Sequence, residues 1–314
     1  MSLTVGVDIG GTKIASGVVD EKGTILEQGR IPTPSHDAAQ LRAVIVGVVQ
    51  DLRTRHDVTG VGLGAAGFVA ADRRRVYFAP NLDFGTEPLA DILQDALGIP
   101  VGIENDGNAA AWAEFRFGAG QGIPDQLMVA LGTGVGGGLI LGGELYRGGH
   151  GVAAEIGHIG VVRDGIPCNC GRRGCLEQYS SGGALQRDAR IAAAAGRAPA
   201  LLKAAGGDPQ AITGGLVTEL AQSGDPGALE LFTLFADSLG VGIASLVAVL
   251  DPTLIILGGG VSEAGDVLLT PTRRALEREI TGAGNRPYPE LRIAHMGNDA
   301  GLIGAADLAR LLPA

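Results

Sequence analysis

Residues 3–19 read LTVGVDIGGTKIASGVV, and residues 127–141 read LMVALGTGVGGGLIL. In each stretch an apolar run ends in glycines and one threonine, and a second apolar run follows. This order predicts a strand, a glycine turn and a second strand. Because it occurs once in each half of the chain, before alternating helix and strand patterns, we expect two related α/β lobes with one glycine turn each.

The segments around the two turns extend the α/β pattern. In the first third we expect strands at residues 25–31, 58–67 and 101–104 and helices at 37–56, 89–97 and 106–117. A Gly/Pro-rich joint at residues 118–124 ends this βββαβαβ unit. In the second half we expect helices at 182–195, 199–205, 209–222, 225–250, 262–280 and 299–312, and strands at 253–257 and 291–294.

The composition excludes several classes of protein. With 24 Lys and Arg against 34 Asp and Glu, the 314 residues carry a net charge of −10, which argues against a nucleic-acid or anionic-membrane surface. The longest apolar run, 12 residues from Leu239 to Leu250, is shorter than a bilayer span. Asp8 interrupts any secretory signal. We therefore expect a cytoplasmic protein.

All three cysteines lie in one short stretch. Cys168, Cys170 and Cys175 follow the sequence Glu155-Ile156-Gly157-His158. Three thiolates and one imidazole make a closed tetrahedral zinc set, which indicates a structural metal. The alternative is three core thiols and a surface histidine. Glu155 and Glu177 flank the metal loop, and rigid carboxylates suit sugar hydroxyls; without zinc they are ordinary surface glutamates.

The first glycine turn, Gly10-Gly11-Thr12-Lys13, follows Asp8 at a strand end. Consecutive backbone N–H groups and the Thr12 hydroxyl can approach a phosphate, and a neighbouring carboxylate indicates magnesium between the two. The alternative is a tight hairpin in which the glycines adopt positive φ and Asp8 caps the turn. Lys13 is then a solvated flanking residue.

Two further glycine stretches can approach a ligand. Residues 132–137, Gly-Thr-Gly-Val-Gly-Gly, match the dinucleotide fingerprint. The fingerprint requires a helix after the glycines, whereas a strand follows here, so we interpret the stretch as a second glycine hairpin. Gly259 and Gly260 lie between a predicted strand and a predicted helix, where they suit a ring, a phosphate or plain close packing.

Glu104-Asn105-Asp106 joins a predicted strand to a predicted helix. The ordinary use of an aspartate here is as the helix N-cap. The functional interpretation is that the carboxylate of Asp106, at the carboxyl end of a strand and kept ionised by the helix N-terminus, accepts a proton from a substrate hydroxyl. Asn105 can both donate to and accept from a sugar.

These motifs together resemble the ROK family (repressors, open reading frames and sugar kinases), and within it the bacterial glucokinases. The resemblance runs from residue 3 to about residue 305. It implies a two-lobed actin-like α/β fold with an interlobe cleft. Residues 1–118 and the C-terminal helix 299–314 are expected to form the small lobe, and residues 119–298 the large lobe with its zinc loop. The family also implies a dimer or tetramer.

The resemblance implies a role for single residues. Asp106 is expected to be the general base, and Asp8 to assist magnesium. The residues expected to hold phosphates are Gly10, Gly11, Thr12, Lys13, Gly132, Thr133 and Gly134, with Gly259 and Gly260 on the adenosine side. Those expected to hold the sugar are Asn105, Asp106, Glu155, His158 and Glu177, with Gly67 and Asn81 as further candidates. The zinc ligands are expected to be His158, Cys168, Cys170 and Cys175.

The resulting hypothesis is ATP-dependent phosphorylation of glucose at its 6-hydroxyl, with transient Mg²⁺ and structural Zn²⁺. Mannose, fructose, N-acetylglucosamine and N-acetylmannosamine are alternative acceptors, and other nucleotides or polyphosphate are alternative donors. From other classes, a sugar-sensing regulator is disfavoured because the phosphate motif begins at Asp8, with no room for a preceding helix-turn-helix, and because the chain is acidic. A nicotinamide-dependent dehydrogenase is disfavoured because no helix follows Gly137.

Overall fold

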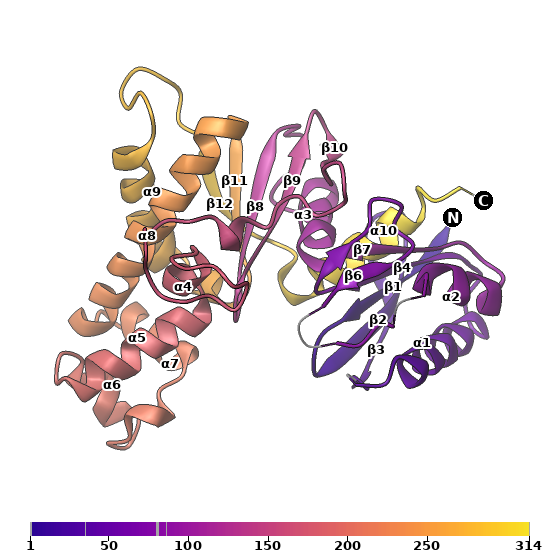
Figure 1. Cartoon of the computed structure of the whole chain (residues 1–314), viewed down its shortest axis with the longest axis horizontal. Helices are drawn as coiled ribbons and strands as arrows, with labels where there is room; N and C mark the ends of the chain where they lie inside the picture. Colours follow the sequence, from indigo (N-terminus) through magenta and orange to yellow (C-terminus); the bar gives the residue numbers. More distant parts are fainter. Residues whose placement is uncertain (1, 35, 80–81, 86, 314) are drawn as a thin grey trace. The chain divides into compact units, whose positions relative to one another are not determined.

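Figure 1 shows the computed structural model of the chain, which describes residues 2–34, 36–79, 82–85 and 87–313. The described residues form two compact units. Unit 1 is drawn from the ranges Met1–Pro124, Gly138–Ala154 and His295–Ala314, and unit 2 from Asp125–Gly137 and Glu155–Ala294. These units are groups of residues in mutual contact. They are not the same as the two expected lobes, residues 1–118 with 299–314 and residues 119–298, whose limits remain a prediction.

A five-stranded sheet with the order β3-β2-β1-β4-β7 forms the centre of unit 1. Its strands are β1 (Leu3–Ile9), β2 (Lys13–Val19), β3 (Ile25–Pro32), β4 (Val58–Ala65) and β7 (Val101–Asn105). β1 pairs antiparallel with β2 and parallel with β4, and β4 pairs parallel with β7. The helices are α1 (Ala38–Arg53), α2 (Leu89–Leu97), α3 (Asp106–Phe117) and α10 (Ala300–Ala309). The predicted element order is confirmed, although the short hairpin of β5 (Phe68–Val69) and β6 (Val76–Phe78) was not predicted.

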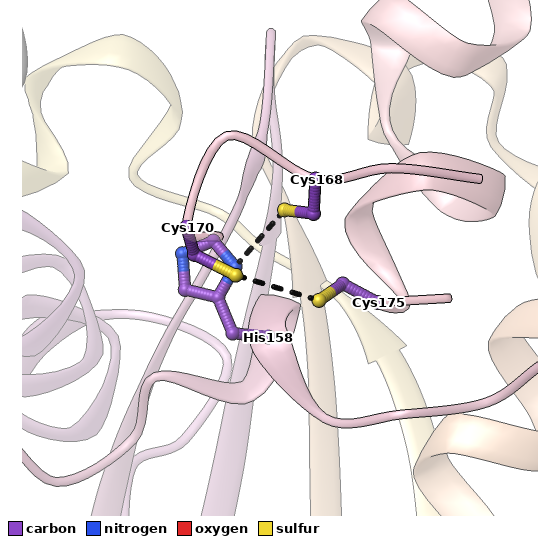
Figure 2. A group of neighbouring side chains, drawn as sticks. All are labelled: His158, Cys168, Cys170 and Cys175. Carbon is purple, nitrogen blue, oxygen red and sulfur yellow. Dashed lines mark hydrogen bonds between the residues drawn. The ribbon is translucent and has the colours of Figure 1, made fainter. Parts of the chain in front are cut away.

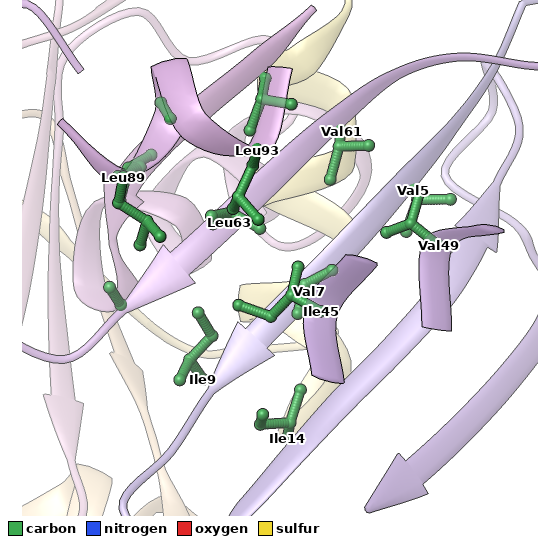
Figure 3. Packing of buried hydrophobic residues seen from close by; sticks show 14 of the residues in the cluster. Val5, Val7, Ile9, Ile14, Ile45, Val49, Val61, Leu63, Leu89 and Leu93 are labelled. Carbon is green, nitrogen blue, oxygen red and sulfur yellow. The ribbon is translucent and has the colours of Figure 1, made fainter. Parts of the chain in front are cut away.

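One face of this sheet carries a hydrophobic core. Side chains alternate along a strand, so every second residue of β1 and β4 points to this face. A layer of buried aliphatic side chains joins β1 and β4 to α1 and α2 (Figure 3): Val5, Val7, Ile9, Val61, Leu63, Ile45, Val49, Leu89 and Leu93. Burial of each such side chain stabilises the fold by about 1.5–3 kcal/mol. The layer therefore holds β1, which carries Asp8, firmly in place.

The other face of the sheet is lined by a row of glycines. Gly6 of β1 pairs with Gly62 of β4, which pairs with Gly102 of β7. α10 packs directly on this row. A Cβ on Gly6 would lie 2.0 Å from the Leu302 carbonyl oxygen, and a Cβ on Gly62 1.8 Å from that of Ala305. Glycine is required here because helix backbone, rather than a flexible side chain, occupies the space.

Gly62→Ala is therefore expected to lower the free energy of unfolding by about 1–3 kcal/mol or more, because the added methyl group meets backbone that can move only together with α10. Gly47→Ala is the matched control. Gly47 is exposed in the middle of α1, and a Cβ there meets no atom within 4 Å, so this variant should gain about 0.5–1 kcal/mol. Urea unfolding measures both changes, and equal effects of the two substitutions would contradict the packing described here.

The second sheet has the order β10-β9-β8-β11-β12. Its strands are β8 (Gln126–Leu131), β9 (Val135–Leu141), β10 (Glu144–Leu145), β11 (Leu254–Gly258) and β12 (Glu290–Ile293). The helices of unit 2 are α4 (Glu177–Ser180), α5 (Gly182–Ala194), α6 (Pro199–Ala204), α7 (Gly214–Gln222), α8 (Pro226–Leu250) and α9 (Asp266–Glu279). β11 pairs in parallel with both β8 and β12.

The helix predicted at residues 209–222 is wrong in its first part. A single 3-10 turn, η2 (Pro209–Ala211), occupies that place, and α7 begins only at Gly214. Thr213 has an extended backbone, and its hydroxyl accepts the Leu216 N–H at 3.2 Å. Threonine favours this capping arrangement over a helix interior, which separates the two segments.

The apolar run near residue 240 belongs to α8, which is longer than the run itself. α8 has 25 residues and, by length and composition alone, is apolar enough to cross a membrane. However, 44% of its most apolar window is buried inside the protein, and it packs on α4, α5, α7 and α9. It is a partly buried core helix. The predicted start is confirmed, because the Asp225 carboxylate accepts the Ala228 N–H at 2.9 Å.

Candidate functional site

The junction of β7 and α3 positions Asn105 and Asp106. Asn105 is the N-cap of α3, because its side-chain oxygen accepts the Asn108 N–H at 3.0 Å. Asp106 is the first helical residue, and its carboxylate accepts the Gly107 N–H at 2.9 Å. The capping role considered for Asp106 is therefore wrong. Because Asn105 satisfies the helix end, the Asp106 carboxylate is not needed there.

The electrostatics of this junction favour a proton acceptor. Although Asp106 is exposed, desolvation raises its pKa, and the backbone N–H groups of Gly107 and of Asp106 itself oppose this rise only in part. The helix N-terminus, which was expected to keep Asp106 ionised, lowers this pKa by less than desolvation raises it. A carboxylate with a raised pKa is a better base near neutral pH.

Asp8, on β1, is electrostatically linked to Asp106. Burial and, to a smaller extent, the negative charge of Asp106 raise the pKa of Asp8 to about 6, although Lys13 lowers it in part. The start of α10 is close to this carboxylate, since a Cβ on Gly301 would lie 3.4 Å from Asp8 Cγ. The protein thus leaves the charge of Asp8 poorly compensated, which suits a carboxylate that faces a cation.

The turn between β1 and β2 presents its backbone to solvent. The Gly10 N–H donates to the Lys13 carbonyl at 3.0 Å, and Gly11, Thr12 and Lys13 are exposed. Neither Gly10 nor Gly11 has a positive φ, so the interpretation of these glycines as a positive-φ hairpin is wrong. Thr33 holds the turn, donating from its hydroxyl to the Gly10 carbonyl at 2.7 Å. An open backbone held in this way fits an anion site.

The second glycine turn, between β8 and β9, is confirmed as a hairpin followed by a strand. Glu177, the first residue of α4, accepts the Val135 N–H at 3.0 Å. A Cβ on Gly134 would lie only 2.3 Å from a carboxylate oxygen of Glu177. Glycine at this position therefore allows Glu177 to contact the turn. Glu177 is expected to bind the sugar, whereas the turn is expected to bind phosphates. Sequence spacing gave no sign of this contact.

The predicted zinc ligands meet in unit 2. His158 lies at the end of a 3-10 turn, η1 (Ile156–His158), and its side chain points towards the cysteine loop (Figure 2). The four ligand atoms of His158, Cys168, Cys170 and Cys175 all lie within 4.8 Å of one another. The loop can close because Gly171 and Gly174 have φ of 87° and 72°. At Gly174 a Cβ would lie 1.7 Å from the Val162 carbonyl oxygen.

The spacing of this cluster fits zinc. The Cys170 and Cys175 sulfurs are 3.6 Å apart, and Cys168 Sγ is 3.6 Å from His158 Nδ1. Two thiolates held by one zinc at about 2.3 Å lie about 3.8 Å apart in a tetrahedron. The sulfurs are thus already separated as zinc requires, with free thiols rather than a disulfide. The alternative of unrelated core thiols does not account for the converging histidine.

A pocket of about 690 Å³ lies beside the second glycine turn in unit 2. Gly182 and Gly183, at the start of α5, donate their N–H groups to the carbonyls of Gly132 and Thr133 at 2.8 and 3.2 Å. The polar side chains that line the pocket are Thr133, Gln186, Thr218, Glu219, Gln222 and Glu263. No lysine or arginine is among its lining residues in the described part of the chain.

Sequence analysis missed two glycine pairs of this pocket, Gly182-Gly183 and Gly214-Gly215. Each pair follows a hydroxyl residue that caps a helix, Ser181 for α5 and Thr213 for α7. These pairs could have been found from the sequence, because each belongs to a run of one serine or threonine followed by two glycines at a helix start. Without a Cβ, such a helix start allows another backbone segment or a ligand to approach closely.

The predicted site residues divide into two groups, one in each unit. In unit 1, the Asn105 side-chain N–H donates to the Gly67 carbonyl at 3.1 Å, which joins two of the sugar candidates. In unit 2, Gly260 lines the pocket, whereas Gly259 packs tightly on Leu131, where a Cβ would lie 2.6 Å from backbone atoms. Asn81 lies outside the described residues.

Comparison with known proteins adds an independent line of evidence. Residues 4–311 match the model of the ROK family. The chain is 48% identical to the glucokinase of Streptomyces coelicolor over 99% of this chain and 98% of that protein. It superposes with a TM-score of 0.88 on the ROK family glucokinase of Streptomyces griseus in complex with glucose and AMPPNP, at 48% identity over 99% and 100% of the two chains. The ROK hexokinase of Thermus thermophilus gives 0.80 at 36% identity over 98% of both chains.

Proposed function

The chain belongs to the ROK family, and we propose that it is a glucokinase, which transfers the γ-phosphoryl group of ATP to the 6-hydroxyl of glucose. The observation that carries this proposal is 48% identity to a glucokinase over almost the whole of both chains. The Streptomyces griseus relative holds glucose and a nucleotide analogue. The chain also has a carboxylate with a raised pKa, two glycine turns and a pocket beside the second turn.

Asp106 is the general base of this reaction. As the 6-oxygen of glucose attacks the γ-phosphorus, the new P–O bond forms and the bond to the departing ADP breaks, while the hydroxyl proton passes to Asp106. The raised pKa of Asp106 supports this role. Asn105 holds the end of α3 and so keeps Asp106 at the first helical position.

The glycine turns and the unit 2 pocket hold the nucleotide. The Gly10 and Gly132 N–H groups are bonded within their own turns, so the backbone N–H groups of Gly11, Thr12, Thr133 and Gly134 are the ones that face the phosphates. The pocket suits the uncharged adenosine, because its glycines permit close approach and its glutamates would repel a polyphosphate chain. Asp8 is the proposed magnesium ligand, and magnesium, when bound, would neutralise charge on the phosphoryl oxygens.

Zinc at His158, Cys168, Cys170 and Cys175 is structural. With four protein ligands no position stays open for water. The metal fixes the loop between Glu155 and Glu177, and these two carboxylates hold sugar hydroxyls. Val135, in the second glycine turn, already donates its N–H to Glu177.

The experiment that tests the function measures ADP release with ATP and Mg²⁺ for glucose, mannose, fructose, N-acetylglucosamine and N-acetylmannosamine. Glucose should have the highest kcat/KM, and its product should be oxidised by glucose 6-phosphate dehydrogenase. 6-Deoxyglucose is the matched control and should not be phosphorylated, because it lacks the acceptor hydroxyl. A higher kcat/KM with another sugar would move the assignment to that sugar, and no turnover with any sugar would contradict the kinase proposal.

The pKa of Asp8 gives a pH-dependent prediction. Because folding raises it from 3.8 to about 6, the folded chain retains this proton more tightly than the unfolded chain, and the Asp8 contribution to stability falls as pH rises from about 4 to about 6. Asp8→Asn should remove this penalty. It should raise the free energy of unfolding by at most about 3 kcal/mol at pH 7 and much less at pH 4.

Thermal unfolding of wild type and Asp8→Asn across pH 4–8 measures the difference, and ADP release at pH 7 measures the accompanying loss of activity. Stabilisation that does not change with pH would contradict the assigned cause. A fully active variant would contradict the role of Asp8 at the phosphates.

The chain is a cytoplasmic dimer or tetramer in this proposal. Its donor, ATP, is a cytoplasmic metabolite. Sedimentation analysis that finds only monomer would contradict this assembly.

A further inference from the structure

Glu104, two residues before the proposed base, is a buried carboxylate with only 2% of its surface exposed. Such a group is costly to bury unless its oxygens have hydrogen-bond partners. Its Oε1 accepts the Asn105 N–H at 3.2 Å and the Asn108 side-chain N–H at 3.0 Å. Its Oε2 lies 2.7 Å from Arg147 Nε. One oxygen of Glu104 therefore binds residues on both sides of Asp106. The other oxygen binds Arg147, which is distant in sequence.

A second arginine strengthens this cluster. Arg73, in the turn between β5 and β6, has its Nε 3.7 Å from Glu104 Oε2 and donates to the Ile103 carbonyl at 3.4 Å. It has a φ of 61°, a left-handed conformation that is strained for an arginine. Strain of this kind persists where the surroundings hold the residue firmly.

Arg147 begins a tight loop that ends just before Glu155. The Ala153 N–H donates back to the Arg147 carbonyl at 3.0 Å. Ala154 has a φ of 66°, which is again strained for a residue with a Cβ. At Gly151 a Cβ would lie 2.4 Å from the Val69 carbonyl oxygen, so the loop packs closely on β5. The loop is therefore tightly packed along most of its length. Its first residue, Arg147, is held by the ion pair with Glu104.

Stability alone does not account for this arrangement. Buried ion pairs contribute little net stability, and apolar replacements of similar volume are often equally stable. What the pair does is to join two segments: the turn that carries Asp106, and the loop whose next residue is Glu155, one of the proposed sugar ligands.

We infer that Glu104 and Arg147 are positioning residues for phosphoryl transfer, because their ion pair holds the turn of the general base in register with the loop that leads to the sugar ligands. This inference rests on the proposed function. The pair touches neither sugar nor nucleotide in this scheme, and it acts through Asp106 and Glu155.

The test substitutes Arg147→Met, which removes the guanidinium and keeps most of the apolar stem. A displacement of about 1 Å at a reacting group can cost about 10²-fold in rate, so kcat/KM for glucose should fall by about 10–100-fold. The KM for ATP should change by less than about twofold, because the ATP-binding groups lie elsewhere. Arg147→Lys restores the charge and should recover part of the loss.

Arg74→Met is the matched control. Arg74, like Arg147, pairs with a carboxylate, that of Asp91 on α2, and it donates to the Val101 carbonyl at 2.6 Å. Its contacts lie at the other end of β7 from Asp106. This variant should lose less thermal stability than Arg147→Met, because Asp91 is half exposed, and it should keep the kinetic constants of wild type for glucose.

A double-mutant cycle with Glu104→Gln completes the test. If the pair acts as a unit, the double variant should be no slower than the slower single variant. Additive losses, a normal kcat/KM in folded Arg147→Met, or an equal loss in Arg74→Met would each overturn the inference. Wild type is assayed in parallel, so a failure of the proposed function shows as absent wild-type turnover and is distinguished from a failure of the positioning role.

Discussion

Asp106→Asn should lower kcat for glucose phosphorylation by about 10²–10⁴-fold, the range that general-base catalysis contributes. The amide has nearly the same shape as the carboxylate but cannot accept the hydroxyl proton. Its oxygen can still accept the Gly107 N–H, which lies 2.9 Å from the carboxylate in wild type. Asn105 remains the cap of α3, so the helix and the fold should be retained.

Steady-state assays together with circular dichroism check this result. Asp95→Asn is the matched control, because Asp95 is an exposed aspartate on α2 in the same unit. It should leave kcat and the unfolding temperature unchanged. If the Asp106 variant kept more than a tenth of the wild-type kcat, the proton would have another acceptor and the proposed mechanism would be wrong.

Cys170→Ala should release zinc and raise the KM for glucose together. Cys170 is the exposed member of the cluster, so its loss removes a metal ligand with little loss of packing. Loss of groups that support a metal site typically costs about 10–100-fold in affinity or activity, and we expect an increase of this size in the glucose KM. The unfolding temperature should also fall, because metal binding is coupled to folding of the loop.

Asn169→Ala serves as the control for the loop itself. Asn169 is exposed and lies between two of the ligands, so its replacement should change neither the zinc content nor the glucose KM. Metal analysis of both purified variants gives the zinc content directly. A Cys170 variant that holds no zinc yet binds glucose normally would show that the metal does not support Glu155 and Glu177.

Much of the fold could be predicted because its signals are local. Runs of apolar residues predicted the strands of the first sheet, and the helices predicted from residues 37 and 225 are confirmed, with Asp37 and Asp225 as the N-caps of α1 and α8. The two-lobed α/β architecture of the ROK family is confirmed. The short β5–β6 hairpin was missed because two- and three-residue strands carry too little periodicity to be recognised.

The sequence by itself determined the chemistry that depends on neighbours in the chain: the glycine turn after Asp8, the spacing of three cysteines and a histidine, and an aspartate at the start of a helix. Only the tertiary structure decided how distant segments share their contacts. In the tertiary structure Asn105 caps α3, and Glu177 lies close to Gly134. α10 packs on the glycine row, and Glu104 forms an ion pair with Arg147. The physical reason is that each of these contacts depends on backbone geometry and on which polar groups are buried together, and neither is encoded by residues close in sequence.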